Sequence, residues 1–407
     1  MRIKHLVVGS ALACVATALA CAEPSGQEPE AQAAAPGPQQ QASSETYSEY
    51  RPGTTEVRPG QWRAPEFDPP SILDYKPNPM LVTEENLVTS AKFPVIDIHS
   101  HQRATEENME ELVAEMDELN VQVLVNLSGG SGDELRERVE TVRNGPYPDR
   151  FRLFANVDFG GVGPGWGEQA AEQLRQDVEA GAIGLKVFKS LGMTNLKLDG
   201  TRLQVDDPEL DPVWAMAGEL DIPVLIHTAE PPAFFEEPDY SNERWLELAL
   251  FPSRRNFRPD QVDFETLLQE RDRMMLKHPD TKFIAAHFGY HAHDLQRGAE
   301  VLDSIPNLYL DLSAVLYDFG RQPRAAREFF IEYQDRLIFG KDAYQPREFP
   351  YYWRVFETAD EYFDYYRDYH AYWKLYGMDL PDDVLRKIYY ENALAVTPGL
   401  PTSAYGG

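Results

Sequence analysis

The sequence is poor in cysteine and in basic residues, and both shortages limit what the protein can do. Its 407 residues include only two cysteines, Cys14 and Cys21, so the chain beyond residue 21 has no disulfide, cysteine-ligated metal or cysteine nucleophile. Lys and Arg number 38 against 67 Asp and Glu, and no run of basic residues interrupts the formal net charge of −29. We therefore expect no nucleic acid and no anionic membrane surface as a binding partner of the folded part.

Two catalytic signatures are absent as well. No Gly-x-Ser-x-Gly motif occurs, which excludes the serine mechanism of the α/β-hydrolases. The glycine-rich segment 161–167 lacks both the Gly-x-Gly-x-x-Gly spacing and the lysine of a phosphate-binding loop. We interpret that segment as a flexible connection between a strand and a helix.

Residues 1–20 have the pattern of a secretory signal peptide. Two basic residues precede an apolar stretch over 6–19, which is too short to span a membrane. Two kinds of processing fit: cleavage after Ala20, or lipoprotein processing in which Cys21 becomes the acylated first residue. We expect the second, although Ala18 stands where a lipoprotein signal prefers Leu. The protein is thus predicted to be exported, as a periplasmic protein or a membrane-anchored lipoprotein.

The signal is followed by a segment of low complexity. Residues 21–60 are mainly Glu, Gln, Pro, Ala, Gly and Ser, and Val57 is their only aliphatic residue larger than Ala. Such a composition buries too little apolar surface to fold, so we predict a disordered linker or tether. We assign residues 61–400 to one folded domain and residues 401–407 to a tail.

Short β-rich runs alternate with amphipathic helical patterns from about residue 93 onward. Eight such runs are present, over 94–101, 121–128, 151–157, 182–189, 222–228, 282–288, 307–313 and 335–342. Helical spacing is clear at Met109, Leu112, Val113 and Met116. This alternation predicts an α/β fold, a (β/α)8 barrel of the TIM type, with a doubly wound sheet as the alternative.

Two connections, 229–263 after the fifth strand and 343–381 after the eighth, are too long to be simple linkers. In a barrel both would lie on the face where the strands end, which is where active sites form. The second connection holds fourteen aromatic residues between Tyr344 and Tyr376. We expect them to pack an extra helical layer, and the alternative is a lid that stacks on a substrate.

Four histidines and an aspartate lie at the ends of predicted strands: His99, His101, His227, His287 and Asp342. Residues two apart in a strand point to the same face, so His99 and His101 can bind one cation side by side. The carboxyl ends of parallel strands converge on one mouth, where the others can complete the shell. Three histidines and an aspartate suit zinc or another borderline divalent ion. The alternative is a set of core histidines, each with its own polar partner.

The sequence resembles the amidohydrolase superfamily over residues 90–397. The motifs that carry the resemblance are Asp97-Ile98-His99-Ser100-His101, the strand ends at His227 and His287, Gly340-Lys341-Asp342, and Tyr389-Tyr390-Glu391-Asn392-Ala393. The most similar branch is the amidohydrolase-related group that includes aminocarboxymuconate-semialdehyde decarboxylase. The resemblance implies a metal-dependent barrel in which His99, His101, His227 and Asp342 are ligands. It also implies that His287 polarises the substrate or helps to activate water.

Two more residues at the predicted site have open roles. Lys186 lies on the fourth strand, where members of the superfamily with two metals have a carboxylated lysine that bridges them. We favour an unmodified Lys186 beside a single metal, paired with a carboxylate or a substrate anion. Asp97 lies on the same face as His99 and is expected to form a hydrogen bond behind a ligand histidine, and the alternative is a plain polar group inside the barrel.

The overall prediction is an exported hydrolase that cleaves a C–N or C–O bond of a small molecule with metal-activated water. Asp342 would take the proton of that water and deliver it to the leaving group. Zinc is the expected metal and manganese the alternative. A metal-dependent decarboxylase and a catalytically silent binding lipoprotein are the other hypotheses, and an oligomer is compatible with all three. Lys189, Arg254, Arg255 and Arg347 are candidates for binding a substrate carboxylate at the mouth.

Overall fold

The computed structural model describes residues 51–370 and 373–405 of the chain. Contacts divide the chain into two units, Met1–Ser71 and Ile72–Gly407. The predicted signal peptide, Cys21 and most of the predicted linker lie outside the described residues. Within the described ranges, no helix is long and apolar enough to cross a membrane.

A short hairpin forms in the first unit. Its strands β1 (Thr55–Arg58) and β2 (Gln61–Arg63) pair in antiparallel fashion, and Gly60 in the turn has a φ of 76°. Only glycine adopts this left-handed conformation without strain, so the turn suits the sequence. The composition of the predicted linker indicates no regular structure, yet its residues 55–58 form β1. Val57 in the linker and Trp62 just beyond it both favour strands.

The second unit is a closed barrel of eight parallel strands, which confirms the predicted (β/α)8 fold. The strands are β3 (Val95–Ser100), β4 (Val121–Asn126), β5 (Phe151–Leu153) continued by β6 (Ala155–Asn156), β7 (Leu185–Val187), β8 (Val224–Ile226), β9 (Phe283–Ala285), β10 (Leu308–Asp311) and β11 (Leu337–Ile338). They pair in chain order. Backbone hydrogen bonds then join the last strand to the first, from Ile98 N to Phe339 O (3.1 Å) and from Asp342 N to His99 O (2.6 Å).

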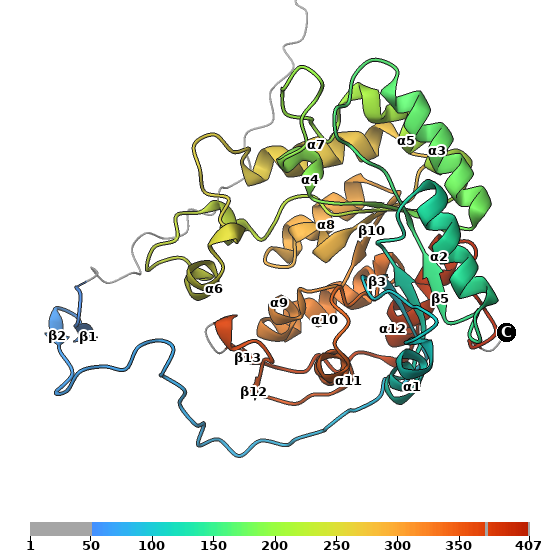
Figure 1. Ribbon diagram of the computed structural model, residues 1–407. Helices are drawn as coiled ribbons and strands as arrows, with labels where there is room; N and C mark the ends of the chain where they lie inside the picture. Colours follow the sequence, from blue (N-terminus) through green and yellow to red (C-terminus); the bar gives the residue numbers. More distant parts are fainter. Residues whose placement is uncertain (1–50, 371–372, 406–407) are drawn as a thin grey trace, which may run out of the picture. The chain divides into compact units, whose positions relative to one another are not determined.

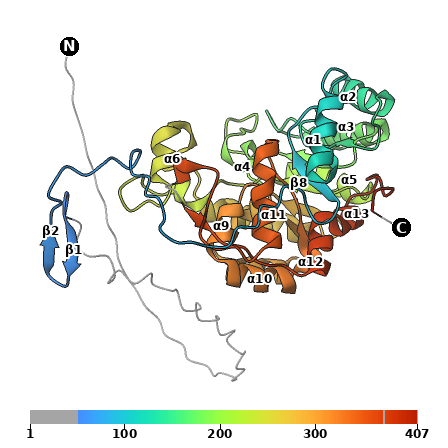
Figure 2. The same cartoon turned by 90° about the horizontal axis from the view of Figure 1, so that it is seen from below.

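Helices lie outside the strands (Figures 1 and 2). They are α1 (Met109–Leu119), α2 (Gly132–Asn144), α3 (Trp166–Ala180), α4 (Ser190–Met193), α5 (Asp211–Glu219), α6 (Trp245–Leu250), α7 (Phe264–Lys277), α8 (Leu295–Ser304), α9 (Leu316–Arg321), α10 (Pro323–Glu332), α11 (Phe349–Glu357), α12 (Asp382–Arg386) and α13 (Asn392–Val396). The predicted apolar stripe of α1 is buried as expected. A π-helical turn, Lys387–Glu391, joins α12 to α13.

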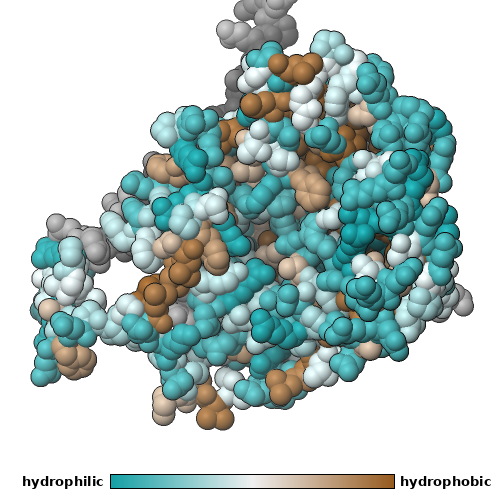
Figure 3. All heavy atoms as spheres, in the orientation of Figure 1, coloured by the Kyte–Doolittle hydropathy of each residue, from teal (hydrophilic) through white to brown (hydrophobic). Residues whose placement is uncertain are grey.

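The two long connections contain short elements instead of unstructured loops. The connection after β8 carries α6, and the one after β11 carries α11 and the short strands β12 (Phe363–Asp364) and β13 (Lys374–Leu375). All aromatic residues of α11 except the partly buried Tyr351 are buried, and the ring centroids of Trp353 and Phe339 lie 5.1 Å apart. The aromatic-rich segment thus packs an additional layer against the barrel, as predicted. The face of the molecule in Figure 3 is mostly hydrophilic, in keeping with the many charged residues.

Candidate metal centre

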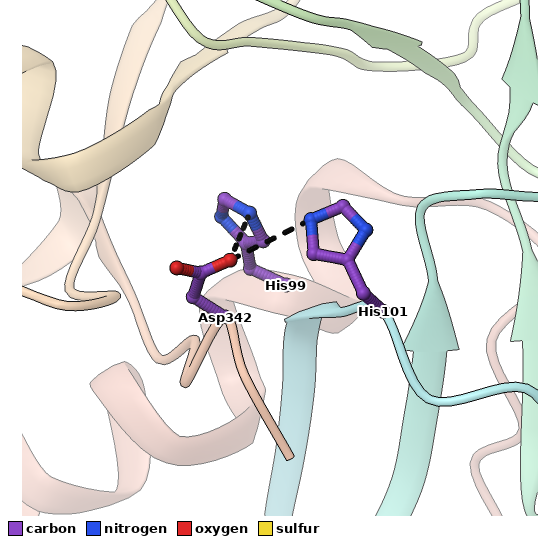
Figure 4. A group of neighbouring side chains, drawn as sticks. All are labelled: His99, His101 and Asp342. Carbon is purple, nitrogen blue, oxygen red and sulfur yellow. Dashed lines mark ion pairs between the residues drawn. The ribbon is translucent and has the colours of Figure 1, made fainter. Parts of the chain in front are cut away.

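His99, His101 and Asp342 form one group at the carboxyl end of the barrel strands (Figure 4). Each offers a ligand atom, and these atoms lie within 4.8 Å of one another. Oδ1 of Asp342 is 3.6 Å from Nε2 of His99 and 3.5 Å from Nε2 of His101. The hydrogen bonds that close the barrel place the three side chains together, because they join the end of β3 to the residues after β11.

Gly340 allows this close approach. A Cβ at Gly340 would lie 2.7 Å from the Cβ of His99, which is nearer than real Cβ contacts permit. Any other residue would push β3 away from the end of β11. Packing therefore requires the glycine of the Gly-Lys-Asp sequence.

Asp311, at the end of β10, orients the ring of His99. Its Oδ2 lies 2.6 Å from Nδ1 of His99, and its Oδ1 accepts a hydrogen bond from the main-chain N of His287 (3.0 Å). Burial alone would raise the pKa of Asp311, but its charge interaction and hydrogen bond with His99 outweigh burial and hold the pKa below its usual value. Burial, followed by the charge of Lys186, lowers the pKa of His99 to about 4. The neutral ring then carries its proton on Nδ1, and Nε2 presents a lone pair to a metal.

His287 belongs to a second group with His99 and Asp311. It begins a left-handed turn in which His287, Phe288, Gly289 and Tyr290 all have φ between 57° and 59°. Nδ1 of His287 lies 3.0 Å from the carbonyl oxygen of Ser313. A carbonyl only accepts hydrogen bonds, so Nδ1 of His287 donates to it, and in the singly protonated ring Nε2 is an acceptor that lies 3.3 Å from Nδ1 of His227.

His227 contacts His287 and stands outside the group of His99, His101 and Asp342. Its Nδ1 is 3.3 Å from Nε2 of His287, and its Nε2 is 2.8 Å from the hydroxyl oxygen of Tyr290. That hydroxyl also lies 3.3 Å from Oε2 of Glu230. If the proton of His227 is on Nδ1, its Nε2 accepts from Tyr290 and is the atom available as a ligand.

Lys186, on β7, is buried beside the ligand group. Its Nζ lies 3.4 Å from Nε2 of His99, and among the described residues no carboxylate is within ion-pair distance. Burial lowers the pKa of Lys186 to about 8, although Asp311 and Asp342 raise it. The structure thus places Lys186 at the site, near the atom that a metal would contact.

Asp97 supports the main chain at this point. Its Oδ1 accepts hydrogen bonds from the backbone N of His99 (3.1 Å) and of Lys341 (2.9 Å). Its Oδ2 has no hydrogen-bond partner among the described residues, and burial raises the pKa of Asp97 to about 8. Asp97 therefore lies behind His99 as expected, but it holds the backbone, while Asp311 holds the imidazole ring.

The chemistry of this donor set fits a divalent metal. Neutral imidazole nitrogens and a carboxylate are the ligands that zinc and similar ions take. The side chain of Asp342 accepts no hydrogen bond from any described residue. Burial would raise the pKa of Asp342, but the nearby histidines outweigh burial and hold the pKa below its usual value. A cation is the group that would satisfy its oxygens.

Comparison with known proteins assigns the family. A sequence model of the family described as amidohydrolase matches residues 145–397. The chain belongs to this amidohydrolase family. The resemblance predicted from the motifs is thereby confirmed, and the family supports a metal-dependent enzyme. No curated protein sequence matches this amidohydrolase significantly.

Several solved structures are similar to the amidohydrolase at low identity. One is an uncharacterised TIM-barrel protein from Bordetella bronchiseptica, with 17% identity, TM-score 0.46, and coverage of 75% of this chain and 98% of the other. A second is dihydroxybenzoic acid decarboxylase from Polaromonas sp. JS666, solved with manganese and an inhibitor. Its sequence is 16% identical, the TM-score is 0.47, and the match covers 75% of this chain and 96% of the other. A third is 5-carboxyvanillate decarboxylase from Sphingomonas paucimobilis. Its sequence is 18% identical, the TM-score is 0.44, and the match covers 70% of this chain and 82% of the other.

A cavity of about 190 Å³ lies beside the ligand group of the amidohydrolase. His227, His287 and Asp342 line it together with charged side chains from the two long connections. Of the four cations expected at the mouth, Lys189 and Arg254 line this cavity, whereas Arg255 and Arg347 do not; Arg244 and Arg367 line it in addition. None of the described aromatic residues of 344–376 lines it, so the alternative of an aromatic lid is not supported.

Sequence reasoning missed Asp311, Ser313 and Tyr290 at the site of this amidohydrolase. Asp311 and Ser313 end a predicted strand, and the rule that singled out the histidines applies equally to them. Tyr290 follows His287 by three residues and reaches His227 only because the backbone turns left-handed there. No local pattern indicates that turn.

Proposed function

We propose that the protein is a metal-dependent hydrolase that cleaves a C–N or C–O bond of a small molecule, such as an amide, lactone or ester. The observation that supports this best is the group of His99, His101 and Asp342 at the mouth of the barrel. Its histidine Nε2 atoms and its carboxylate face one another, and Asp311 keeps His99 in the tautomer that a metal needs.

His99, His101, His227 and Asp342 would hold the ion, zinc in the first place and manganese as the alternative. The ion supplies Lewis acidity and makes water acidic enough to attack near neutral pH. Oδ1 of Asp342 would accept the proton of the attacking water and return it to the leaving group. For His227 to join, the Tyr290 hydroxyl would turn from Nε2 of His227 toward Glu230.

A metal-dependent decarboxylase is the second candidate, and Lys186 favours it. The buried ammonium group lies 3.4 Å from Nε2 of His99 with no carboxylate partner among the described residues. A cation in that position would hold the carboxylate that leaves as carbon dioxide. In the hydrolase, the same unmodified Lys186 would hydrogen-bond the substrate near a single metal.

The first experiment is elemental analysis of the purified protein beside a His227→Ala variant, with His293→Ala as control. His293 is exposed and outside the proposed ligand set. We expect about one metal per chain in the wild type and in His293→Ala, and a loss in His227→Ala. Two metals per chain would make Lys186 a bridging carbamate, and none after growth with zinc and manganese would contradict both enzyme proposals.

The reaction itself is tested with the metal-loaded protein on amides, lactones, esters and carboxylic acids. Release of an acid from the first three classes, without carbon dioxide, supports hydrolysis. Release of carbon dioxide from an acid supports the second candidate and contradicts the first.

A further inference from the structure

The cavity beside the proposed metal ligands has an unusual balance of charge. Four cationic side chains line it, namely Lys189, Arg244, Arg254 and Arg367. The protein as a whole carries a formal charge of −29, so a cluster of cations is not an average property of its surface. Three carboxylates, Glu230, Glu247 and Asp342, line the same cavity, so its four cations exceed its anions by one, next to the reacting centre.

Three of these cations already have carboxylate partners. Lys189 forms an ion pair with Glu230, and both Arg244 and Arg254 pair with Glu247. Arg244 uses Oε2 of Glu247 and Arg254 uses Oε1, so both oxygens of that carboxylate are engaged. Lys189 is thus balanced by Glu230, whereas Arg244 and Arg254 share the single charge of Glu247, and these ion pairs hold all three cations in the wall of the cavity.

Arg367 is different. Its nearest carboxylate oxygen is Oε2 of Glu348 at 3.9 Å, which is too far for a hydrogen bond. The same oxygen lies 2.7 Å from Nζ of Lys341, so its charge is already balanced. Among the described residues the guanidinium of Arg367 has no hydrogen-bond partner, and its side chain is 22% exposed. A guanidinium with five donors that is largely removed from water needs an acceptor.

The guanidinium is also held in place. It lies over the ring of Tyr366, with its central carbon 5.3 Å from the ring centroid. A cation–π contact of this kind restrains the guanidinium and uses none of its N–H donors. An arginine held in this way is suited to a planar anion that accepts two parallel hydrogen bonds.

We propose that Arg367 binds a carboxylate group of the substrate, so that the enzyme acts on a small organic acid whose reacting bond lies at the metal centre. This inference rests on the proposed function, because it takes the cavity as the substrate site. A carboxylate is a planar anion whose two oxygens can accept two parallel hydrogen bonds from one guanidinium. The cavity of about 190 Å³ is smaller than the ~300–1,000 Å³ usual for drug-sized ligands, which also favours a small acid.

The test measures equilibrium binding, so it does not depend on turnover. The zinc-loaded full chain is titrated by calorimetry with benzoate and glutarate, and with the uncharged benzamide and glutaramide as matched probes. The variants are Arg367→Gln and Arg367→Lys, with Arg347→Gln as control. Arg347 is an exposed arginine of the same connection and does not line the cavity. Thermal unfolding of each variant checks that it is folded.

We expect at least one of the acids to bind the wild type, and Arg367→Gln to weaken that binding roughly 10- to 100-fold. Arg367→Lys keeps the charge but loses the planar fork, so its loss should be smaller. Arg347→Gln should bind as the wild type does, and the amides should not distinguish the variants. The inference is wrong if neither acid binds the wild type, or if Arg367→Gln and Arg347→Gln bind equally well. Binding that depends on Arg367, without turnover of any amide, lactone or ester, would contradict the proposed hydrolysis and retain the carboxylate site.

Discussion

Oδ2 of Asp311 lies 2.6 Å from Nδ1 of His99, and both side chains are almost completely buried. The two residues are 212 positions apart in the sequence. Their contact determines which nitrogen of His99 carries the proton, and therefore whether Nε2 can bind a metal. The first two predictions concern the groups that control the ligand nitrogens.

Asp311→Asn should weaken metal binding. An amide can donate to Nδ1 of His99, which would move the ring proton to Nε2 and block the ligand atom. We expect a loss of metal affinity of roughly 10- to 100-fold, measured by titration of the metal-free protein with zinc. Asp335→Asn is a matched control, because Asp335 is exposed and pairs with Lys387. Equal affinities in the two variants would contradict the role of Asp311.

Tyr290→Phe should strengthen metal binding. The Tyr290 hydroxyl lies 2.8 Å from Nε2 of His227 and competes with a metal for that lone pair. Its removal should lower the dissociation constant for zinc by up to about tenfold, the loss of roughly one hydrogen bond. Tyr376→Phe, outside the cavity, serves as control. A weaker zinc affinity in Tyr290→Phe would show that the hydroxyl supports the ligand set instead of competing with it.

The free energy of unfolding should depend on pH through His291. This side chain is buried, its Nε2 lies 3.1 Å from Nη2 of Arg271, and burial followed by the charge of Arg271 lowers its pKa to about 2. Between pH 2 and 6.5 the unfolded chain therefore binds more protons at His291 than the folded chain does. The contribution of the neutral His291 to the free energy of unfolding is fully present above pH 6.5 and is lost as the pH falls.

We expect this group to reduce the free energy of unfolding by an amount approaching about 1.4 kcal/mol per pH unit below pH 6.5. Urea denaturation of the wild type and of His291→Gln between pH 7 and 5 measures the difference in slope. Gln keeps an oxygen for Arg271 but does not titrate. The exposed His293, replaced by Gln, should leave the slope of the wild type unchanged, and an unchanged slope in His291→Gln as well would refute the prediction.

Cys21 should carry a lipid. The full chain, expressed in a Gram-negative host, is expected to incorporate labelled palmitate and to fractionate with membranes. Cys21→Ala should lose both properties, whereas Cys14→Ala, within the signal peptide, should keep them. An unlabelled wild-type protein in the soluble periplasmic fraction would favour simple cleavage after Ala20.

Much of the fold could be predicted from the sequence. Every predicted strand run contains an observed strand, and the stripe over Met109–Met116 became the buried face of α1. These signals are local, because a strand or helix displays its buried face at a fixed period along the chain. The convergence of His99, His101 and Asp342 also followed from the sequence, since a parallel barrel brings the ends of its strands to one mouth.

Tertiary structure decided the partners at that mouth. The contacts of Asp311 with His99 and of Tyr290 with His227 depend on side chains from different strands and connections, and on a left-handed turn at Tyr290. The same holds for the guanidinium of Arg367, which has no hydrogen-bond partner among the described residues. A periodic pattern records which face of an element is buried, but it holds no information about distances between elements. By itself, then, the sequence determined the barrel and the residue types at its mouth. Only the packing of the closed barrel determined which nitrogen is free for a metal and which cation is free for a substrate.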